Sequence, residues 1–348
     1  IYFQKELEFR KQFIYQFSGT IADFIVAISA VLILRNVWAL VLGLLAGNIT
    51  RCFVSYLIHP YRPKLNFALE KVKELFGFGK WILGSSILMF LITQGDDVFV
   101  GKILGTTALG FYQMAYRISN MPVSEITQVI SRVTFPAYSK LQDNISKLRE
   151  AYFKVLQVIA FLSIPMATLI FILAPDFTMI FLGEKWMPIV PAMQVLAFFG
   201  AIRAIGATLG PVYNAKGRPD YPTKLNFMRL VLIVILIYPL TIRFGIFGTA
   251  LTVLLATVIQ NVVLIYQASI FIQAKLLDFG KNLFFPLCSA ICMMGGVLVV
   301  EILCGNNTYG FFVSIVIGLL IYLSLVYIAS KFMGYTIFKR LKEVLNYG

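Results

Sequence analysis

The chain has 348 residues, of which 59% are hydrophobic and only 13% are charged. Soluble domains contain about 25% charged residues, so the composition excludes an ordinary soluble fold. The net charge of +14 is spread singly over short connectors, which excludes the basic face of a nucleic-acid-binding protein. We therefore expect a membrane protein whose basic residues report its orientation and attract lipid headgroups.

Apolar stretches follow one another almost from end to end of the chain. Hydrocarbon about 30 Å thick requires roughly 20 apolar residues per helix. Because backbone groups must be hydrogen-bonded within the bilayer, the sequence predicts an all-α fold, a polytopic membrane helical bundle with about 10 transmembrane helices. The predicted spans are 13–34, 37–58, 79–103, 107–134, 152–173, 188–212, 222–243, 246–270, 283–303 and 309–331.

The connectors between these spans alternate between rich and poor in lysine and arginine. Basic residues stay preferentially on the cytoplasmic side, so the rich connectors and both ends of the chain are predicted to be cytoplasmic. The residues of the rich segments are Lys5, Arg10, Lys11, Arg62, Lys64, Lys71, Lys73, Lys80, Lys140, Lys147, Arg149, Lys216, Arg218, Lys224, Lys275, Lys281, Lys339, Arg340 and Lys342.

The connector 59–78 is the longest on the predicted cytoplasmic side. Two prolines near its start, Pro60 and Pro63, oppose helix there, and the apolar spacing from Leu65 to Phe76 predicts an interfacial amphipathic helix. This segment is interpreted as a cytoplasmic linker between two halves of the protein. The tail 336–347 has a similar but shorter pattern.

Several ionisable residues fall inside the predicted spans. A charge within a bilayer is costly and usually faces a bundle interior, water or a partner. Arg51, Arg132 and Arg229 lie near cytoplasmic ends and are expected to reach the headgroups, whereas Asp96 and Glu301 lie near the outer end and are expected to be solvated. The deeper residues are Asp23, Arg117, Glu125 and Arg203.

Asp97 is the most informative of these charges. It follows Thr93, Gln94 and Gly95 in an otherwise apolar helix, with Arg117 on the next span as a candidate partner. Two interpretations stay open: an ion or substrate contact in a central cavity, or an ion pair that fastens two helices. Prolines and glycines within several spans favour bent helices around a polar interior, as alternating access requires.

No motif in the chain indicates catalysis or a cofactor. His59 is the single histidine and has no carboxylate neighbour, and no phosphate-binding glycine loop, zinc-ligand spacing or nucleophile elbow is present. We therefore expect a protein that is not an enzyme and that has no metal or other cofactor.

Short motifs along the chain match those of a known protein family in order and spacing. With these motifs the chain resembles the polysaccharide transporter or oligosaccharide flippase family (Wzx-like, WzxC-type) of the multidrug/oligosaccharidyl-lipid/polysaccharide (MOP) exporter superfamily. They are Trp38-Ala39-Leu40-Val41 with Gly43, Arg62-Pro63-Lys64-Leu65, Phe78-Gly79-Lys80, Asp97, Gly101, Leu104-Gly105, Ala108-Leu109-Gly110, Tyr112, Ala115, Phe135-Pro136-Ala137-Tyr138-Ser139-Lys140-Leu141-Gln142, Gly183-Glu184-Lys185-Trp186, Ala215-Lys216-Gly217-Arg218, Gly245, Gly248 and Ala250.

The resemblance implies a domain organisation. The family has two bundles related by a pseudo-twofold axis, and the second bundle would begin near Phe76. Residues 1–58 would then be the last two spans of the N-terminal bundle, 59–78 the linker, 79–270 the C-terminal six-helix bundle, and 271–348 two additional helices and a cytoplasmic tail. Because the chain starts at Ile1 rather than Met, we expect that earlier spans precede it and that this part alone is inactive in transport.

The resemblance also implies a function: flipping of an undecaprenyl-diphosphate-linked oligosaccharide across the bacterial cytoplasmic (inner) membrane, by alternating access, for lipopolysaccharide, exopolysaccharide or other cell-surface polysaccharide. Arg117 and Arg203 are hypothesised to contact the anionic diphosphate or acidic sugars, and Asp97 and Asp23 to serve cation coupling or gating. The expected partners are this lipid-linked oligosaccharide and membrane lipids, with a polysaccharide polymerase and export machinery as further candidates.

Two alternatives stay open at this point. A cation-coupled multidrug exporter of the same superfamily would carry small cationic substrates in a more acidic cavity, which the buried arginines disfavour. A membrane polysaccharide polymerase would require a large outer loop or an interfacial acidic pair, and the sequence between residues 1 and 348 contains neither.

Overall fold

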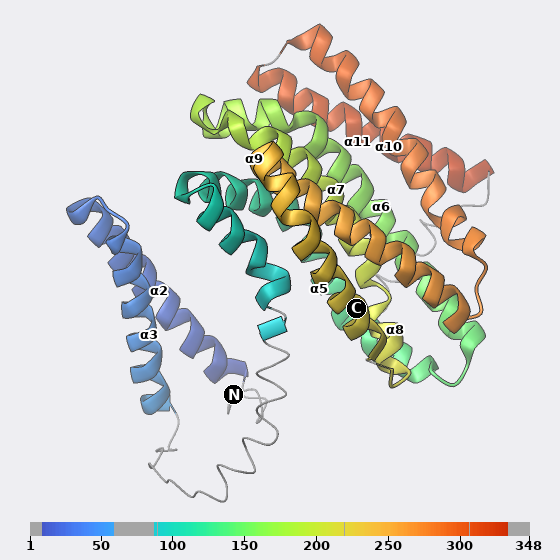
Figure 1. Cartoon of the computed structure of the whole chain (residues 1–348), viewed down its shortest axis with the longest axis horizontal. Coiled ribbons are helices and arrows are strands. Elements are labelled where there is room, and N and C mark those ends of the chain that lie inside the picture. The colour runs from blue at the N-terminus through green and yellow to red at the C-terminus, as the bar shows by residue number, and fades with distance from the viewer. Residues whose placement is uncertain (1–8, 59–86, 89, 219, 306, 333–348) are drawn as a thin grey trace, which may run out of the picture. The chain divides into compact units, whose positions relative to one another are not determined.

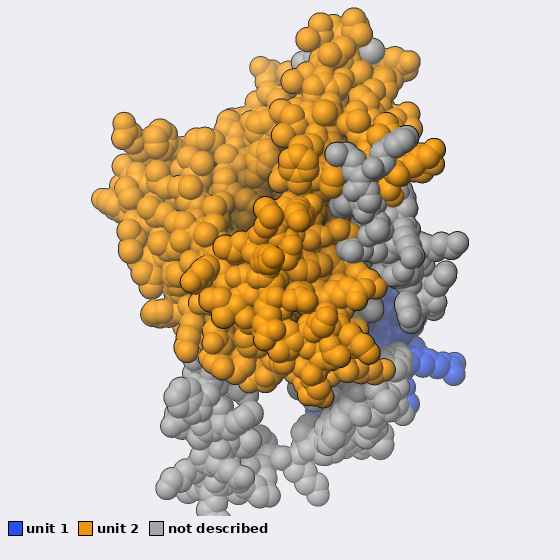
Figure 2. Space-filling view, turned by 90° about the vertical axis from the view of Figure 1, so that its right-hand side faces the viewer, with its two compact units in different colours: residues 1–80 blue, residues 81–348 orange. Residues whose placement is uncertain are grey.

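The structure is a computed structural model that describes residues 9–58, 87–88, 90–218, 220–305 and 307–332. The described secondary structure is helical throughout, as the composition predicted. The amphipathic linker predicted at 59–78 and the tail at 336–347 lie outside the described residues. The described chain belongs to two compact units, residues 1–80 and 81–348, which Figure 2 shows in different colours.

Unit 1 contains two paired helices, α2 (Phe9–Leu34) and α3 (Trp38–Ile58). Small residues allow their backbones to approach. A Cβ placed on Gly43 would lie 2.7 Å from the Cβ of Ala27, and one on Gly47 would lie 2.9 Å from the carbonyl oxygen of Gly19. Gly43 and Gly47 form the Gly-x-x-x-Gly spacing that is typical of close transmembrane pairs. The two predicted spans of this unit are confirmed.

Unit 2 begins with a helical segment at 90–103 and continues through a series of packed helices. Its elements are α5 (Thr106–Leu141), α6 (Ile145–Phe177), the π-helix η1 (Thr178–Leu182), the 3-10 helix η2 (Glu184–Ile189), α7 (Val190–Ala207), α8 (Gly210–Ala215), α9 (Asp220–Phe271), α10 (Leu276–Cys304) and α11 (Thr308–Phe332), and Figure 1 labels the α-helices. Helix α5 continues seven residues beyond the predicted end of its span at residue 134, so the expected loop there is shorter.

The long element α9 is a helical hairpin rather than one rod. At Gly245 the backbone has φ 60° and ψ −141°, a conformation that glycine adopts readily. Contacts across the turn join the two arms, because Thr241 Oγ1 lies 2.9 Å from Thr249 Oγ1 and Thr252 Oγ1 donates to the Leu236 carbonyl at 3.3 Å. The two spans predicted at 222–243 and 246–270 are therefore confirmed as the arms of this hairpin.

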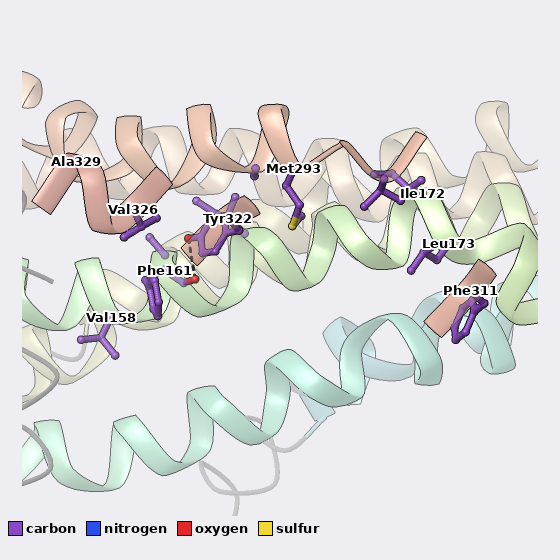
Figure 3. Packing of buried hydrophobic residues seen from close by; sticks show 13 residues of the cluster. Val158, Phe161, Ile172, Leu173, Met293, Phe311, Tyr322, Val326 and Ala329 are labelled. Carbon is purple, nitrogen blue, oxygen red and sulfur yellow. Dashed lines mark hydrogen bonds between the residues drawn. The ribbon is translucent and has the colours of Figure 1, made fainter. Parts of the chain in front are cut away.

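Helix α6 forms the centre of one large core, with α10 and α11 packed beside it. Figure 3 shows this core, in which Phe161 of α6 packs against Tyr322 of α11 with ring centroids 5.6 Å apart. The buried Tyr322 hydroxyl donates to the Phe161 carbonyl at 2.9 Å. This bond satisfies a polar group that would be costly to leave unpaired in an apolar interior.

Seven described helices are long and apolar enough to cross a membrane. One of the seven is the α9 hairpin, which contains two predicted spans. Helix α5 carries several charges within its 36 residues, and of the predicted span 79–103 only residues 87, 88 and 90–103 are described. The fold is thus a polytopic helical membrane protein, as predicted. The boundary between a six-helix bundle at 79–270 and additional helices at 271–348 stays a prediction.

Candidate functional site

The candidate site is a cavity of about 400 Å³ in unit 2. Its walls come from the helix at 90–103, from α5 and from Trp186 of η2. The chain reverses at Gly105, where φ is 89°, so that the two helices run side by side and place their polar residues at one level. The lining residues are Thr93, Gln94, Asp96, Asp97, Gly110, Gln113, Met114, Tyr116, Arg117 and Trp186.

Asp97 and Arg117, both predicted as site residues, line this cavity together. Asp97 Oδ2 accepts a hydrogen bond from Gln113 Nε2 at 3.0 Å, so the Gln113 amide of α5, and not the candidate partner Arg117, contacts this carboxylate. Within the described part of the chain, Arg117 forms no ion pair with Asp97, and its side chain is exposed. The cavity therefore offers a carboxylate and a guanidinium that can meet different charged groups of a ligand.

Asp96 has a different environment from its neighbour Asp97. Its side chain is only 7% exposed, and its Oδ2 accepts a 2.7 Å hydrogen bond from the hydroxyl of Tyr112, which is fully buried. The expectation that Asp96 is solvated near the outer end is therefore wrong. The reason is the turn at Gly105, which brings the Tyr112 hydroxyl within reach of this carboxylate.

Arg203 of α7 lies beside the cavity rather than in its lining. Its Nη2 donates to Ser124 Oγ at 2.7 Å, and its Nη1 contacts the Tyr116 hydroxyl at 3.5 Å. Tyr116 itself lines the cavity. The structure thus connects Arg203 to the site through one aromatic side chain, that of Tyr116.

A second arginine shares this region. The guanidinium groups of Arg203 and Arg229 lie 5.4 Å and 5.6 Å from the centroid of the buried Phe199 ring. The Arg229 Nε is buried and has no hydrogen-bond partner among the described residues. Arg229 was expected to reach the cytoplasmic headgroups; instead its guanidinium packs on Phe199, which favours a cation over its face.

Asp23 lies in unit 1, on α2. Its Oδ1 would lie 2.7 Å from a Cβ on Gly43, and its Cβ 2.9 Å from one on Gly47. The side chain therefore packs over the glycines of α3, and its proposed role in coupling or gating stays a prediction. Among the described residues, no group of three or more His, Cys, Asp or Glu side chains could hold a metal ion.

Tyr112, Gln113, Tyr116 and Trp186 contribute to the site but were not predicted to do so. Tyr112 and Trp186 do occur in the motifs that carry the family resemblance, so the motifs contained a signal. Gln113 and Tyr116 gave no such signal, because their importance depends on which face of α5 meets the helix at 90–103. That face is set by packing and cannot be read from one sequence.

The chain matches the family model described as "Polysaccharide biosynthesis protein" over residues 1–191. It belongs to this family, as the motifs predicted. It is 31% identical over 265 residues to "Lipopolysaccharide biosynthesis protein WzxC" of Escherichia coli (strain K12), covering 74% of this chain and 53% of that protein. It is 29% identical over 340 residues to "Uncharacterized membrane protein in cps region" of Klebsiella pneumoniae, covering 94% and 69%.

The fold is also similar to that of a solved structure, "Lipid II flippase MurJ, inward closed conformation". The TM-score is 0.75 with 17% sequence identity, over 90% of this chain and 67% of the other. At this identity the likeness concerns the fold alone. The chain spans about half the length of the Escherichia coli relative, with 53% covered.

Proposed function

We propose that the protein to which this chain belongs moves an undecaprenyl-diphosphate-linked oligosaccharide across the bacterial cytoplasmic membrane for the synthesis of a cell-surface polysaccharide. The observation that carries the proposal is the polar cavity between the helix 90–103 and α5, which Asp97 and Arg117 line together. Intramembrane charges are costly and are retained chiefly where they meet a substrate, an ion or each other. The family and the name of the Escherichia coli relative, a lipopolysaccharide biosynthesis protein, support a substrate from cell-surface polysaccharide synthesis.

The chemistry of the cavity fits the parts of such a molecule. An exposed guanidinium, that of Arg117, binds diphosphate oxygens through paired hydrogen bonds. Trp186 and Tyr116 present aromatic surfaces with polar edges, to which sugar rings bind. Arg203 adds positive charge one side chain away, through Tyr116. A polyprenyl chain is as apolar as lipid and remains in the bilayer during the passage of the headgroup.

The transport cycle in this proposal is alternating access. The two helical bundles of the whole protein would rock about the substrate, and Asp97 would change its contacts between the two states, with Gln113 as its partner in the state described here. Asp23 would act in the same way in unit 1. Both ends of the chain would lie in the cytoplasm, so that the basic connectors remain on that side.

The proposal is tested by deleting the gene in the organism that encodes the chain and following lipid-linked repeat units. If the protein is a flippase, the deletion causes loss of surface polysaccharide and accumulation of repeat units accessible only from the cytoplasmic side. Deletion of a polymerase would instead leave single repeat units at the cell surface. Deletion of a multidrug exporter would leave the polysaccharide intact and increase the retention of cationic dyes in the cells. Either of the last two results would overturn the proposal.

A further inference from the structure

A second cavity, of about 660 Å³, lies far along the chain from the candidate site. It is built where three segments of unit 2 meet: the first turns of α6, the turn between α9 and α10, and the first turns of α10. The volume is within the range of about 300–1,000 Å³ that is usual for ligand sites. Its lining residues are Ser146, Arg149, Glu150, Phe153, Gln273, Lys275, Asp278 and Asn282.

Hydrogen bonds hold the walls of this cavity in place. Arg149 Nη1 donates to the Gln273 carbonyl at 2.5 Å, which joins α6 to the turn. Further along α6, the Gln157 side-chain amide donates a hydrogen bond to Asn282 Oδ1 at 2.5 Å, which joins α6 to α10. The Asn282 amide in turn donates to the Asp278 carbonyl at 2.6 Å. The cavity is therefore a feature of the packed helices and not a gap between loose side chains.

The lining carries charges of both signs. Arg149 and Lys275 are cationic, Glu150 and Asp278 are anionic, and the N-termini of α6 and α10 add positive ends of helix dipoles. Asp278 uses Oδ2 to accept the Lys275 backbone N–H at 3.1 Å, while its Oδ1 has no hydrogen-bond partner in the described part of the chain. A ligand that fits must combine an anionic group with a cationic group that can donate hydrogen bonds.

The surroundings indicate that this ligand is a lipid. Leu276, Leu277 and Phe284, in the first turns of α10, are exposed, and helices α6 and α10 both qualify as membrane spans that begin at this cavity. A headgroup held at the start of two spans places its acyl chains beside those side chains. A soluble ligand would gain nothing from this apolar border.

We infer that the cavity between the starts of α6 and α10 binds the headgroup of an ethanolamine phospholipid. The phosphate is held by Arg149 and Lys275. The ammonium group donates hydrogen bonds to Asp278 and to Glu150, whose Oε1 also pairs with Lys154 at 3.1 Å on the exposed side of α6. Bound in this way, the lipid connects the first turns of α6 and α10.

Native mass spectrometry of the purified chain in detergent tests this assignment. Phosphatidylethanolamine, phosphatidylglycerol and phosphatidylcholine with identical acyl chains are added one at a time. Phosphatidylethanolamine is expected to bind about tenfold more tightly than the other two. The reason is that the glycerol headgroup has no cation and the quaternary ammonium of choline donates no hydrogen bond. Equal binding of the three lipids, or a preference for phosphatidylglycerol, would overturn the assignment.

Charge-neutralising variants test the contacts to the phosphate and to the ammonium group separately. Arg149→Gln is expected to lower the affinity for phosphatidylethanolamine and for phosphatidylglycerol alike, by about tenfold. The double variant E150Q/D278N is expected to remove the preference for phosphatidylethanolamine while phosphatidylglycerol still binds. The asparagine oxygen at position 278 can still accept the Lys275 backbone N–H. The matched controls are Lys147→Gln and Asp143→Asn, which lie at the same end of α6 but outside the cavity lining. They should change the affinity for neither lipid.

Soluble phosphoethanolamine distinguishes a lipid from a free phosphate ester. It carries the same charged groups without acyl chains, so it should compete with the phospholipid only at concentrations at least about a hundredfold higher. Competition at equal concentrations would show a water-soluble ligand and overturn the lipid assignment. The comparison of lipids on the unaltered chain remains decisive even if a variant does not fold.

Discussion

Adjacent residues on one helix can have opposite roles, and Asp96 and Asp97 illustrate this. Successive side chains on a helix point about 100° apart, because one turn contains 3.6 residues. Asp96 therefore meets the buried Tyr112 hydroxyl at 2.7 Å, whereas Asp97 meets the exposed Gln113 amide at 3.0 Å. Asp96 thus stabilises the contact between two helices, whereas for Asp97 the role in coupling or gating stays a proposal.

Substitution of Tyr112 by phenylalanine tests the stabilising role. The change removes one hydroxyl and leaves the buried Asp96 carboxylate without its partner, so we expect a loss of about 1–3 kcal/mol in the free energy of unfolding. Gln113→Ala removes the equivalent bond to Asp97 at an exposed position, where water replaces it, and should cost well under about 1 kcal/mol. Denaturant unfolding of the purified variants measures both, and equal losses would contradict the distinction.

The proposed substrate contacts make a different prediction, because they concern export rather than stability. Arg117→Ala and Arg203→Ala should each lower export of the surface polysaccharide by at least about tenfold, since each removes a charge-assisted contact to a diphosphate. Asp97→Asn should also lower export, through loss of its charge. The measurement is surface polysaccharide in a deletion strain that produces each variant from a plasmid.

Two controls make the export result interpretable. Immunoblotting of membranes shows whether each variant accumulates normally. Lys185→Gln, which neutralises an exposed cation beside Trp186 but outside the cavity lining, should leave export unchanged. Normal export from both the Arg117→Ala and the Arg203→Ala cells would exclude these residues as substrate contacts.

At the scale of single elements, the close packing of α2 against α3 depends on two glycines, Gly43 and Gly47. A valine at Gly43 would place atoms within 2.7 Å of Asp23 and Ala27, and the helices would have to separate. Overpacking of this kind costs about 1–3 kcal/mol, so we expect amide hydrogen exchange in both helices to quicken by about tenfold or more. Leu44→Val changes an exposed side chain of the same helix and serves as the control. Unchanged exchange in Gly43→Val would show that the helices do not depend on this close approach.

The extents of several helices could be predicted from hydropathy alone. The turn at Gly245, for example, falls between two apolar stretches that are each long enough to cross a bilayer, and the structure makes them the arms of a hairpin. The end of α5 at Leu141 could not be predicted, because Pro136 and Lys140 after residue 134 are typical of a connector, whereas Tyr138 and Leu141 pack into a core of unit 2. Hydropathy indicates the length of a helix in lipid, and it carries little signal where packing against neighbouring helices extends the helix.

At the scale of the whole molecule, the candidate site could be predicted only in part. Asp97 and Arg117 stand out in the sequence because charge is rare inside a span. Arg229 stands out for the same reason, but its contact with Phe199 depends on α7 and α9 meeting in space. The second cavity was not predicted at all, because Arg149, Lys275 and Asp278 lie near helix ends, where charged residues are ordinary. Their arrangement becomes informative only when α6 and α10 are packed together.

The orientation of the whole chain is the last prediction and follows from the distribution of its basic residues. The turn between α8 and α9 contains Lys216 and Arg218, whereas the connector between α10 and α11 contains none, so the first is expected in the cytoplasm and the second outside. In a variant whose four native cysteines are replaced by serine, Asn307→Cys should react with a membrane-impermeant maleimide in intact cells. Lys216→Cys should react only after permeabilisation. The reverse pattern would invert the topology and move the cavity at Arg149 to the outer leaflet, which would also remove the basis for cytoplasmic ends.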